Sequence, residues 1–315
     1  MIIYAINLHA GGGKVLLDTI LTESLFNPLE AIFIDERYPL PIKLPPEVAV
    51  IKVRPTIWGR FTAEFQLHSL IKKLNLKSSS VLFFGNLPPI KRTGLKSFLY
   101  LQNCYLTGEI PLPNDSFKQT LRLTVEKWIL RTFANNVDEI WVQTAWMKQI
   151  CEKIFSKQTT KIHLILPKFP NVQVKAKKYK FITISSFSTH KRLSFFTDAL
   201  KLLDKDLNQS INVVIILDVA IAGALVPINF ENINLTVKYK ISREELATLL
   251  LESETFVATS LYESLYLPLY EAAHYKLNLI APDAGYTIQT NLEISKYPQY
   301  SLNTLVALMK SKIYV

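Results

Sequence analysis

Short apolar segments alternate along most of the chain with longer segments in which hydrophobic positions recur about every three to four residues. In the first half, the expected strands are residues 2–7, 31–34, 48–53, 81–84, 97–101, 139–142 and 161–166. Helical periodicity covers residues 117–133 and 146–155, and a shorter helical pattern follows the glycines at 11–13. Strands that alternate with helices favour a parallel sheet that helices cover on both faces.

A lysine-rich stretch with two prolines, residues 167–178, interrupts this pattern and is the best candidate for a linker. The pattern then restarts with strands at 181–185, 212–217 and 255–259 and helices at 191–203, 242–251 and 268–275. The apolar run 213–228 contains Asp218 and Pro227 and is too short to span a bilayer easily, so a buried strand is expected to begin it. Two such blocks predict two doubly wound parallel sheets. We expect domains at 1–172 and 173–300, followed by a closing helix within 301–315.

Composition agrees with a folded two-domain chain. The 315 residues are 49% hydrophobic, and the mean hydropathy is +0.17. The two cysteines, Cys104 and Cys151, cannot form a disulfide framework and suit a reducing cytosol. Residues 1–8 are apolar without a basic leader, so no secretory signal is visible and a cytoplasmic location is expected.

The basic surplus lies in the first half of the chain. Residues 1–172 hold 21 basic and 13 acidic residues, whereas residues 173–315 hold 15 and 13. Aromatic residues stand among these cations, as at Trp58 near Arg60 and Trp128 beside Lys127. This mixture is typical of a membrane interface, so we expect an anionic membrane surface as a partner, although a solubilising basic surface would look similar. A nucleic-acid partner is not expected, because no nucleic-acid-binding motif accompanies the pI of about 9.3.

The most informative stretch contains two glutamates, Glu263 and Glu271, separated by seven residues. Pro268 favours a helix start between them, which would place Glu263 in the preceding loop and Glu271 in the first turn. The free N–H groups and the dipole of a helix N-terminus favour a phosphate. The two carboxylates can accept hydrogen bonds from a ribose and from a sugar, so the stretch suits a nucleotide-sugar. Alternatively, Glu271 only stabilises the start of the helix.

Residues 263–272, which read E-S-L-Y-L-P-L-Y-E-A, resemble the E-G-F-G-L-P-x-x-E-A signature of retaining glycosyltransferases of family four. Both acids, the Leu-Pro pair and the final alanine match, but Tyr266 stands where the family usually has glycine. The resemblance implies the GT-B fold, in which two Rossmann-like domains face an interdomain cleft. It also implies that the closing helix crosses back to the first domain, and that this crossing is short.

The resemblance assigns roles around a donor. Glu271 would hold the ribose, Glu263 the transferred sugar, and Lys191 with Ser186 the diphosphate, with Glu263 and Lys191 as the catalytic residues. Gly12, Gly13, Tyr266 and Leu267 would also border the donor. Ser186 occupies the position of the family's usual arginine, although Ser186 with His190 and Lys191 resembles a pattern of O-antigen transferases. His190 itself is interpreted as a loop or packing histidine.

On the acceptor side, Asn86, Gln102 and Asn103 follow two strands and resemble acceptor loops of the same transferases, which often have histidine at the position of Gln102. The implied enzyme transfers a sugar from a nucleotide-sugar to a lipid-linked or polysaccharide acceptor, with retention, in bacterial lipopolysaccharide, O-antigen or capsule synthesis. It would act at the cytoplasmic face of the inner membrane. No metal or other cofactor is expected, because the five histidines are scattered and Cys-x-x-Cys is absent. A non-catalytic sugar-nucleotide-binding partner and a GT-B epimerase remain alternatives.

Overall fold

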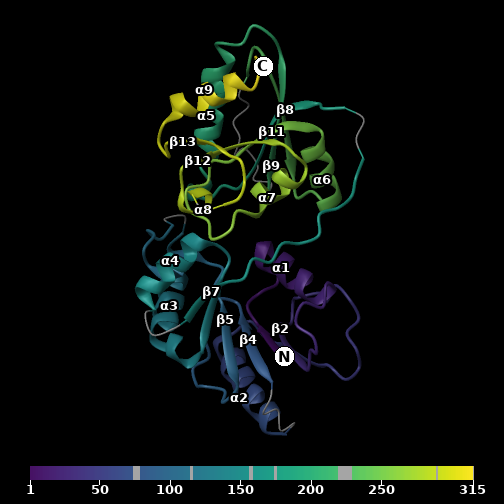
Figure 1. Cartoon of the computed structure of the whole chain (residues 1–315), viewed down its shortest axis with the longest axis vertical. Helices are drawn as coiled ribbons and strands as arrows, with labels where there is room; N and C mark the ends of the chain where they lie inside the picture. The colour runs from purple at the N-terminus through teal and green to yellow at the C-terminus, as the bar shows by residue number, and fades with distance from the viewer. Residues whose placement is uncertain are drawn as a thin grey trace. The chain divides into compact units, whose positions relative to one another are not determined.

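The computed structural model describes residues 1–73, 79–113, 116–155, 159–173, 176–218, 229–288 and 290–314. The chain forms two compact units, one comprising Met1–Leu112 with Ser116–Lys168 and the other comprising Phe169–Val315. The second unit begins at Phe169, whereas the sequence pattern places the boundary after residue 172. Each unit is built on its own parallel sheet, so the prediction of two doubly wound α/β domains is confirmed (Figure 1).

The first unit holds a seven-stranded sheet in the order β3-β2-β1-β4-β5-β6-β7. Its strands are β1 Ile2–Ala5, β2 Ala31–Asp35, β3 Ala49–Val53, β4 Ser80–Phe84, β5 Lys96–Tyr100, β6 Glu139–Val142 and β7 Thr159–Ile162. Its helices are α1 Gly11–Thr22, α2 Ile57–Lys73, α3 Phe117–Phe133 and α4 Ala145–Ile154, with the 3-10 turns η1 Cys104–Thr107 and η2 Ala134–Asn136.

Alternate residues of β1 identify the helices on the two faces of this sheet, because successive side chains of a strand point to opposite faces. Ile3 and Ala5 pack in one core cluster with the buried leucines and isoleucine of α1. Tyr4 lies between them in sequence, and its hydroxyl donates to the carbonyl of Arg60 in α2 at 3.4 Å. Therefore α1 and α2 cover opposite faces.

The second unit holds a six-stranded sheet in the order β10-β9-β8-β11-β12-β13. Its strands are β8 Tyr179–Ser185, β9 Ile211–Leu217, β10 Ile233–Tyr239, β11 Ser253–Val257, β12 Asn278–Pro282 and β13 Ser295–Tyr297. Its helices are α5 Leu193–Asp204, α6 Arg243–Leu251, α7 Leu267–His274, α8 Gly285–Ile288 and α9 Leu302–Ser311, with the 3-10 turn η3 Thr189–Lys191.

Two core clusters occupy the two faces of the second sheet. Phe196 and Leu200 of α5 pack with Leu305 and Met309 of α9 over one face. Leu250 of α6 and Leu269 of α7 belong to the cluster on the other face. The buried side of α9 therefore belongs to the core of the second unit, and the expected crossing of this helix to the first domain stays a prediction.

Helix α2 was not predicted from the sequence, and the reason is physical. Its buried side is small, with Ala63 and Leu67, while large apolar residues such as Trp58 and Phe65 are exposed on the other side. Hydrophobic residues on both sides of a helix remove the periodicity by which it is recognised. Strands β10, β12 and β13 and the short helix α8 were also missed. The strand expected at 161–166 is β7, which lies earlier, at Thr159–Ile162.

The apolar run 213–228 begins within β9, as predicted, but residues 219–228 lie outside the described part of the chain. Among the helices that the structure describes, none combines the length and apolarity that a bilayer span requires. The helix expected at 242–251 is α6, and it begins with a side-chain cap, since the hydroxyl of Ser242 accepts the backbone N–H of Glu245 at 3.1 Å.

Asp204, the last residue of α5, fixes the chain segment that leads into β10. Its carboxylate accepts the backbone N–H groups of Glu231 and Asn232 at 2.9 and 2.8 Å. Because a buried N–H without an acceptor is costly, we expect Asp204→Ala to lower the free energy of unfolding by about 1–3 kcal/mol. Urea denaturation measures this change. The control is Asp198→Ala on the same helix, which removes only an exposed ion pair with Lys201 and should change stability by less than about 0.5 kcal/mol.

Candidate functional site

The strand order of the second sheet reverses between β8 and β11, and the loops after these two strands form the candidate site. Successive crossovers run from β8 through β9 to β10, and the chain then returns to place β11 on the other side of β8. Ligands of open α/β sheets bind beyond the carboxyl ends of the strands at such a point. The two loops are residues 186–192 after β8 and 258–266 after β11.

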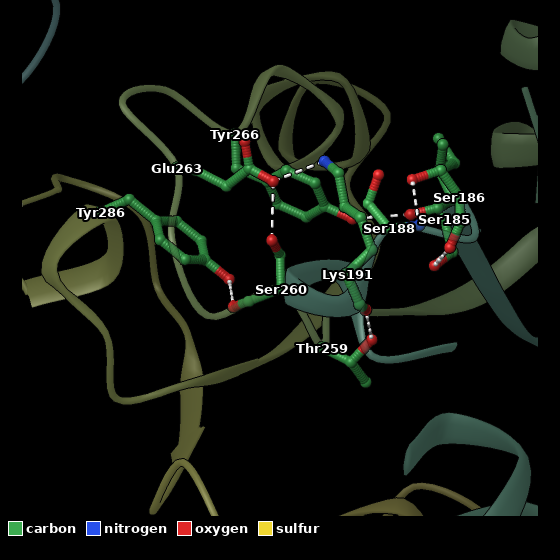
Figure 2. Close-up of polar contacts among 10 residues, drawn as sticks. Ser185, Ser186, Ser188, Lys191, Thr259, Ser260, Glu263, Tyr266 and Tyr286 are labelled. Atoms are coloured by element: carbon green, nitrogen blue, oxygen red, sulfur yellow. Dashed lines mark hydrogen bonds and ion pairs between the residues drawn. The ribbon is translucent and has the colours of Figure 1, made fainter. Parts of the chain in front are cut away.

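Lys191 and Glu263, one from each loop, meet at this edge. The Lys191 ammonium donates to Glu263 Oε1 at 2.5 Å, and the hydroxyl of Ser260 donates to the same oxygen at 2.7 Å. Figure 2 shows both groups directed at the Glu263 carboxylate. The side chains of Lys191 and Glu263 are 22% and 16% exposed, so the pair is partly shielded but accessible from solvent.

Hydrogen bonds between the loops hold this pair in place. The hydroxyl of Thr259 donates to the carbonyl of Lys191 at 2.8 Å, and the N–H of Leu261 donates to the carbonyl of His190 at 2.9 Å. Below them, the hydroxyl of Tyr286 donates to the carbonyl of Ser260 at 2.7 Å (Figure 2). The backbone that carries Lys191 is therefore fixed to the loop that carries Glu263.

Tyr266 is buried beneath Lys191, with only 2% of its surface exposed. Its ring packs between Phe256 and Tyr286, and its hydroxyl donates to the carbonyl of Ile184 at 2.8 Å. The Lys191 ammonium lies 4.9 Å from the centre of the ring, within the range of a cation–π interaction. The Tyr266 side chain therefore supports Lys191 from below, and a direct contact of Tyr266 with a donor would have to come from its backbone.

Glu271 does not lie where the sequence placed it. Helix α7 begins at Leu267, so Glu271 falls in the second turn, and the expectation of a first-turn carboxylate is wrong. Glu271 is buried and accepts a hydrogen bond from Arg243 Nη2 at 3.0 Å. Burial raises the pKa of Glu271 to about 7, although the Arg243 charge opposes this shift. The sequence analysis did not identify Arg243 as a site residue. The one feature that could have indicated it is its position directly after the N-cap residue of α6.

The other residues expected on the donor side border this centre less closely. The hydroxyl of Ser186 accepts the N–H of Ser188 at 3.3 Å, a contact within its own loop. Leu267 is the first residue of α7 and is partly exposed. Arg192, the next cation after Lys191, turns away, since its guanidinium donates to the carbonyl of Gln299 and stacks on Phe195 at 3.6 Å.

In the first unit, the predicted glycine and acceptor residues gather where the order of that sheet reverses, between β1 and β4. The three glycines are not a loop before the helix, as the sequence suggested, but the first turn of α1. A side chain at Gly13 would come within 3.2 Å of Gln102 Oε1, so Gln102 lies beside that turn. Asn86 Oδ1 accepts the N–H of Gln102 at 2.6 Å, and Asn103 Oδ1 caps η1 by accepting the N–H of Tyr105 at 3.0 Å.

The chain contains one Asp-x-Asp sequence, Asp204-Lys205-Asp206. Metal-dependent glycosyltransferases with a fold other than GT-B bind a cation through this pattern. Asp204 instead accepts the two backbone N–H groups described above, and Asp206 pairs with Lys310 at 2.6 Å. Both lie at the end of α5, where the chain returns to the amino end of β9, opposite the edge with Lys191. Within the described ranges, no group of three or more His, Cys, Asp or Glu residues is arranged to hold a metal ion.

Comparison with solved structures agrees with this architecture. Sucrose-phosphate synthase from Thermosynechococcus elongatus matches with a TM-score of 0.67 at 13% identity over 99% of this chain and 90% of its own. WaaG, a glycosyltransferase involved in lipopolysaccharide biosynthesis, matches with a TM-score of 0.65 at 15% identity over 100% and 91%. TarM of S. aureus, in complex with fondaparinux, alpha-GlcNAc-glycerol and UDP, matches with 0.56 at 15% identity over 79% and 51%, so the chain spans about half the length of TarM.

At these identities the likeness shows the fold, which is that of GT-B glycosyltransferases. No curated protein matches the chain. The family described as glycosyl transferases group 1 matches residues 167–291. These residues contain the loops of Lys191 and Glu263, the helix α7 and the buried Glu271. Residues 167–291 of this chain of the GT-B fold are therefore similar to the glycosyl transferases group 1 family.

Proposed function

We propose that this chain is a retaining glycosyltransferase that moves a sugar from a nucleotide-sugar donor to a hydroxyl of a lipid-linked or polysaccharide acceptor. The observation that carries the proposal is the Lys191–Glu263 pair, held at 2.5 Å where the strand order reverses within the region similar to the group 1 family. A cation and a carboxylate side by side suit the two halves of a donor. The ammonium pairs with a diphosphate, and the carboxylate accepts hydrogen bonds from sugar hydroxyls.

The diphosphate would lie between Lys191 and the start of α7. The side chain of Tyr266, the N-cap residue of this helix, accepts no hydrogen bond from the first turn. Pro268 has no N–H and the N–H of Leu269 donates to the carbonyl of Tyr266 at 2.9 Å, so the positive end of the helix dipole is what would favour phosphate oxygens here. Lys191 would neutralise the charge that develops on the leaving diphosphate, and the loops would fix the sugar against the acceptor.

The ribose would be held by Glu271, whose carboxylate lies beside the guanidinium of Arg243. The acceptor would meet the first unit near Asn86, Gln102 and Asn103, at the carboxyl edge of β4 and β5. The likeness to WaaG supports a role in the assembly of bacterial surface polysaccharide. A lipid-linked acceptor would place the reaction at the cytoplasmic face of the inner membrane, and retention follows from the resemblance of residues 263–272 to family four.

A second candidate is a protein that binds a sugar-nucleotide without transferring it. Two departures from the family pattern favour it. Ser186 stands in place of an arginine, which leaves one cation fewer for the diphosphate, and Tyr266 fills the position of a glycine. Transfer or hydrolysis of the donor by the purified protein separates this candidate from the enzyme.

A thermal-shift screen against nucleoside diphosphates and their sugars tests the proposal. A ligand that binds only the folded state raises the melting temperature by mass action. We expect one nucleotide to raise it, and its sugar conjugate to be converted in the presence of a polysaccharide or lipid-linked acceptor. A chain stabilised by none of the nucleotides would not be a transferase of this kind.

The two carboxylates should have separate effects. Glu271→Gln should weaken binding of the free nucleoside diphosphate about ten- to hundredfold, since a hydrogen bond to a charged group contributes about 1.5–3 kcal/mol. Glu263→Gln should not weaken nucleotide binding, because its partner on the ligand is the sugar, but it should lower turnover by a similar factor. Calorimetry with the nucleotide and a transfer assay with the full donor measure the two effects.

The matched control is Glu254→Gln. Glu254 also pairs with a lysine, Lys180 at 2.6 Å, but it lies at the start of β11, away from the site. This variant should bind and turn over like the wild type. If the Glu263 and Glu271 variants did the same, both carboxylates would be structural and the proposal would lose its main support.

Ribose binding should depend on the protonation of Glu271. Because burial raises its pKa to about 7, the free site is largely protonated at pH 6 and largely ionised at pH 8. Ribose hydroxyls donate to the ionised form, so binding lowers this pKa and affinity should rise up to tenfold per pH unit below 7, then level off. Calorimetry uses the nucleoside, whose ribose does not titrate in this range. Glu271→Gln should remove the dependence, and a flat wild-type profile would contradict the assignment.

Donor turnover should be independent of divalent metal. Lys191 and the positive end of the α7 dipole would balance the diphosphate charge in place of a bound metal ion, and the Asp-x-Asp residues are engaged in other contacts. We expect the rate to persist in excess chelator. Complete loss of activity in chelator, with recovery on addition of manganese, would overturn this mechanism.

A further inference from the structure

Helix α2 exposes a row of aromatic side chains. Trp58 is 79% exposed and Phe65 81%, and Phe61 lies between them on the same side of the helix, with its ring 6.2 Å from that of Trp58. Residues three, four and seven apart share one face of a helix. Large apolar groups gathered in this way on a surface mark an interaction site rather than a chance exposure.

Helix α3 exposes a second such row. Phe117 is 84% exposed and Trp128 61%, and Leu121 and Val125 are exposed between them. The row runs from Phe117 to Trp128, so at about 1.5 Å of rise per residue it extends about 17 Å along the surface. Its buried side is small, and the buried residues are Leu123 and Leu130.

The two rows lie on the same face of the first sheet. Right-handed crossovers place α2, between β3 and β4, and α3, between β5 and β6, on one face, opposite α1. Two observations agree. Tyr4 points to the face opposite the α1 cluster and bonds the α2 backbone. Glu126 of α3 is also close enough to Arg60 of α2 for the Arg60 charge to act on it. We call the outer sides of α2 and α3 the aromatic face.

The charge of the aromatic face is positive. The two helices contain seven basic residues and two acidic ones. Both acids are neutralised by neighbouring cations, since Glu64 pairs with Arg60 at 3.6 Å and Glu126 with Arg122 at 3.8 Å. Glu64 is buried and accepts the N–H of Ile90 at 2.9 Å, and burial raises the pKa of Glu126. The exposed charges among the aromatic rings are therefore nearly all cations.

A cavity of about 460 Å³ opens beside this row on α2. Phe61, Phe65 and His68 line it with the cationic side chains of Lys72 and Lys91. Glu64 also lines it, but its carboxylate is already engaged by the N–H of Ile90 and by Arg60. Burial, and then the charges of Lys91 and Lys72, lower the pKa of His68. The cavity thus combines apolar walls with convergent positive charge, as the phosphate and upper acyl chain of an anionic lipid require.

We infer that the aromatic face is a docking surface for an anionic lipid bilayer, with a lipid phosphate seated in the cavity between Lys72 and Lys91. Aromatic rings and cations share the headgroup zone of a membrane, where rings insert and cations meet anionic phosphates. The centre of a protein–protein interface, by contrast, is depleted of lysine. The inference rests on the proposed function in one respect only: the docking surface would serve to bring the first unit to a lipid-linked acceptor.

Vesicle sedimentation with the full chain tests the inference. Vesicles of phosphatidylcholine with about one third phosphatidylglycerol should bind the protein at low salt, and pure phosphatidylcholine vesicles should bind it far less. Lys72→Gln with Lys91→Gln should weaken binding about thirtyfold, since each cation near the surface contributes about 1 kcal/mol. Trp58→Ser with Phe65→Ser should weaken it at least tenfold. Brominated lipid should quench Trp58 and Trp128 but not the buried Trp141.

Two matched controls separate the aromatic face from general charge and apolarity. Lys205→Gln with Lys296→Gln removes two exposed cations of the second unit, and Leu25→Ser with Ile162→Ser removes two exposed apolar residues outside α2 and α3. Both should bind vesicles like the wild type. Failure of the wild type to bind anionic vesicles at low salt would overturn the inference, as would equal loss in the control variants, or a dimer in solution that the Trp58 and Phe65 substitutions dissolve.

The thermal shift with nucleotide, measured on every variant, keeps the two proposals apart. The substitutions on the aromatic face should leave it unchanged. Vesicle binding without any nucleotide shift would contradict the transferase proposal and leave the docking surface standing. A nucleotide shift without vesicle binding would contradict the docking surface and leave the transferase proposal standing.

Discussion

The site depends on a single topological constraint, the reversal of strand order between β8 and β11. Where the order reverses, the loops after the two neighbouring strands lead to opposite faces of the sheet and leave room between them. Lys191 and Glu263 are 72 residues apart in sequence, yet each follows one of these strands and they meet at 2.5 Å. The contacts of Thr259, Leu261 and Tyr286 then hold the two loops together, so the geometry of the pair is inherited from the sheet.

This dependence explains how much of the site the sequence could predict. Alternating strands and helices are local patterns, and they locate the ends of β8 and β11 and hence Lys191 and Glu263. The direction of the Tyr266 ring is not local, because it is set by Phe256 and Tyr286, which other segments bring beside it. The same holds for Arg243, which reaches Glu271 from another helix. Glu271 was placed in the wrong turn because the start of the helix was predicted one residue too late, at Pro268, whereas α7 begins at Leu267.

The failure to predict α2 has a different origin and is itself informative. A helix is recognised when its apolar residues lie on one side, facing the core. In α2 the large apolar residues face outward, and Ala63 and Leu67 face the sheet. Folding of the unit therefore gains little from Trp58 or Phe65, whereas burial of these rings in an interaction would be favourable. One sheet of the first unit thus serves two purposes, with its carboxyl edge carrying the Asn86 and Gln102 loops and one of its faces carrying the aromatic rows.

The Lys191–Glu263 pair also bears on how a donor would be selected. In the free site the two charges satisfy each other, so a free phosphate must compete with Glu263 for Lys191. A nucleotide-sugar offers a partner to both at once, the diphosphate to Lys191 and sugar hydroxyls to Glu263. A ligand that engages only one of them leaves the other partly buried without its partner, at a cost of about 1–3 kcal/mol. Because the centre of the Tyr266 ring lies 4.9 Å from the ammonium, the cation–π contact would hold Lys191 in place if Glu263 turned to the sugar. In the proposed enzyme the pairing would therefore favour the complete donor over its fragments, and the tyrosine in place of the usual glycine would let the pair separate without displacing the lysine.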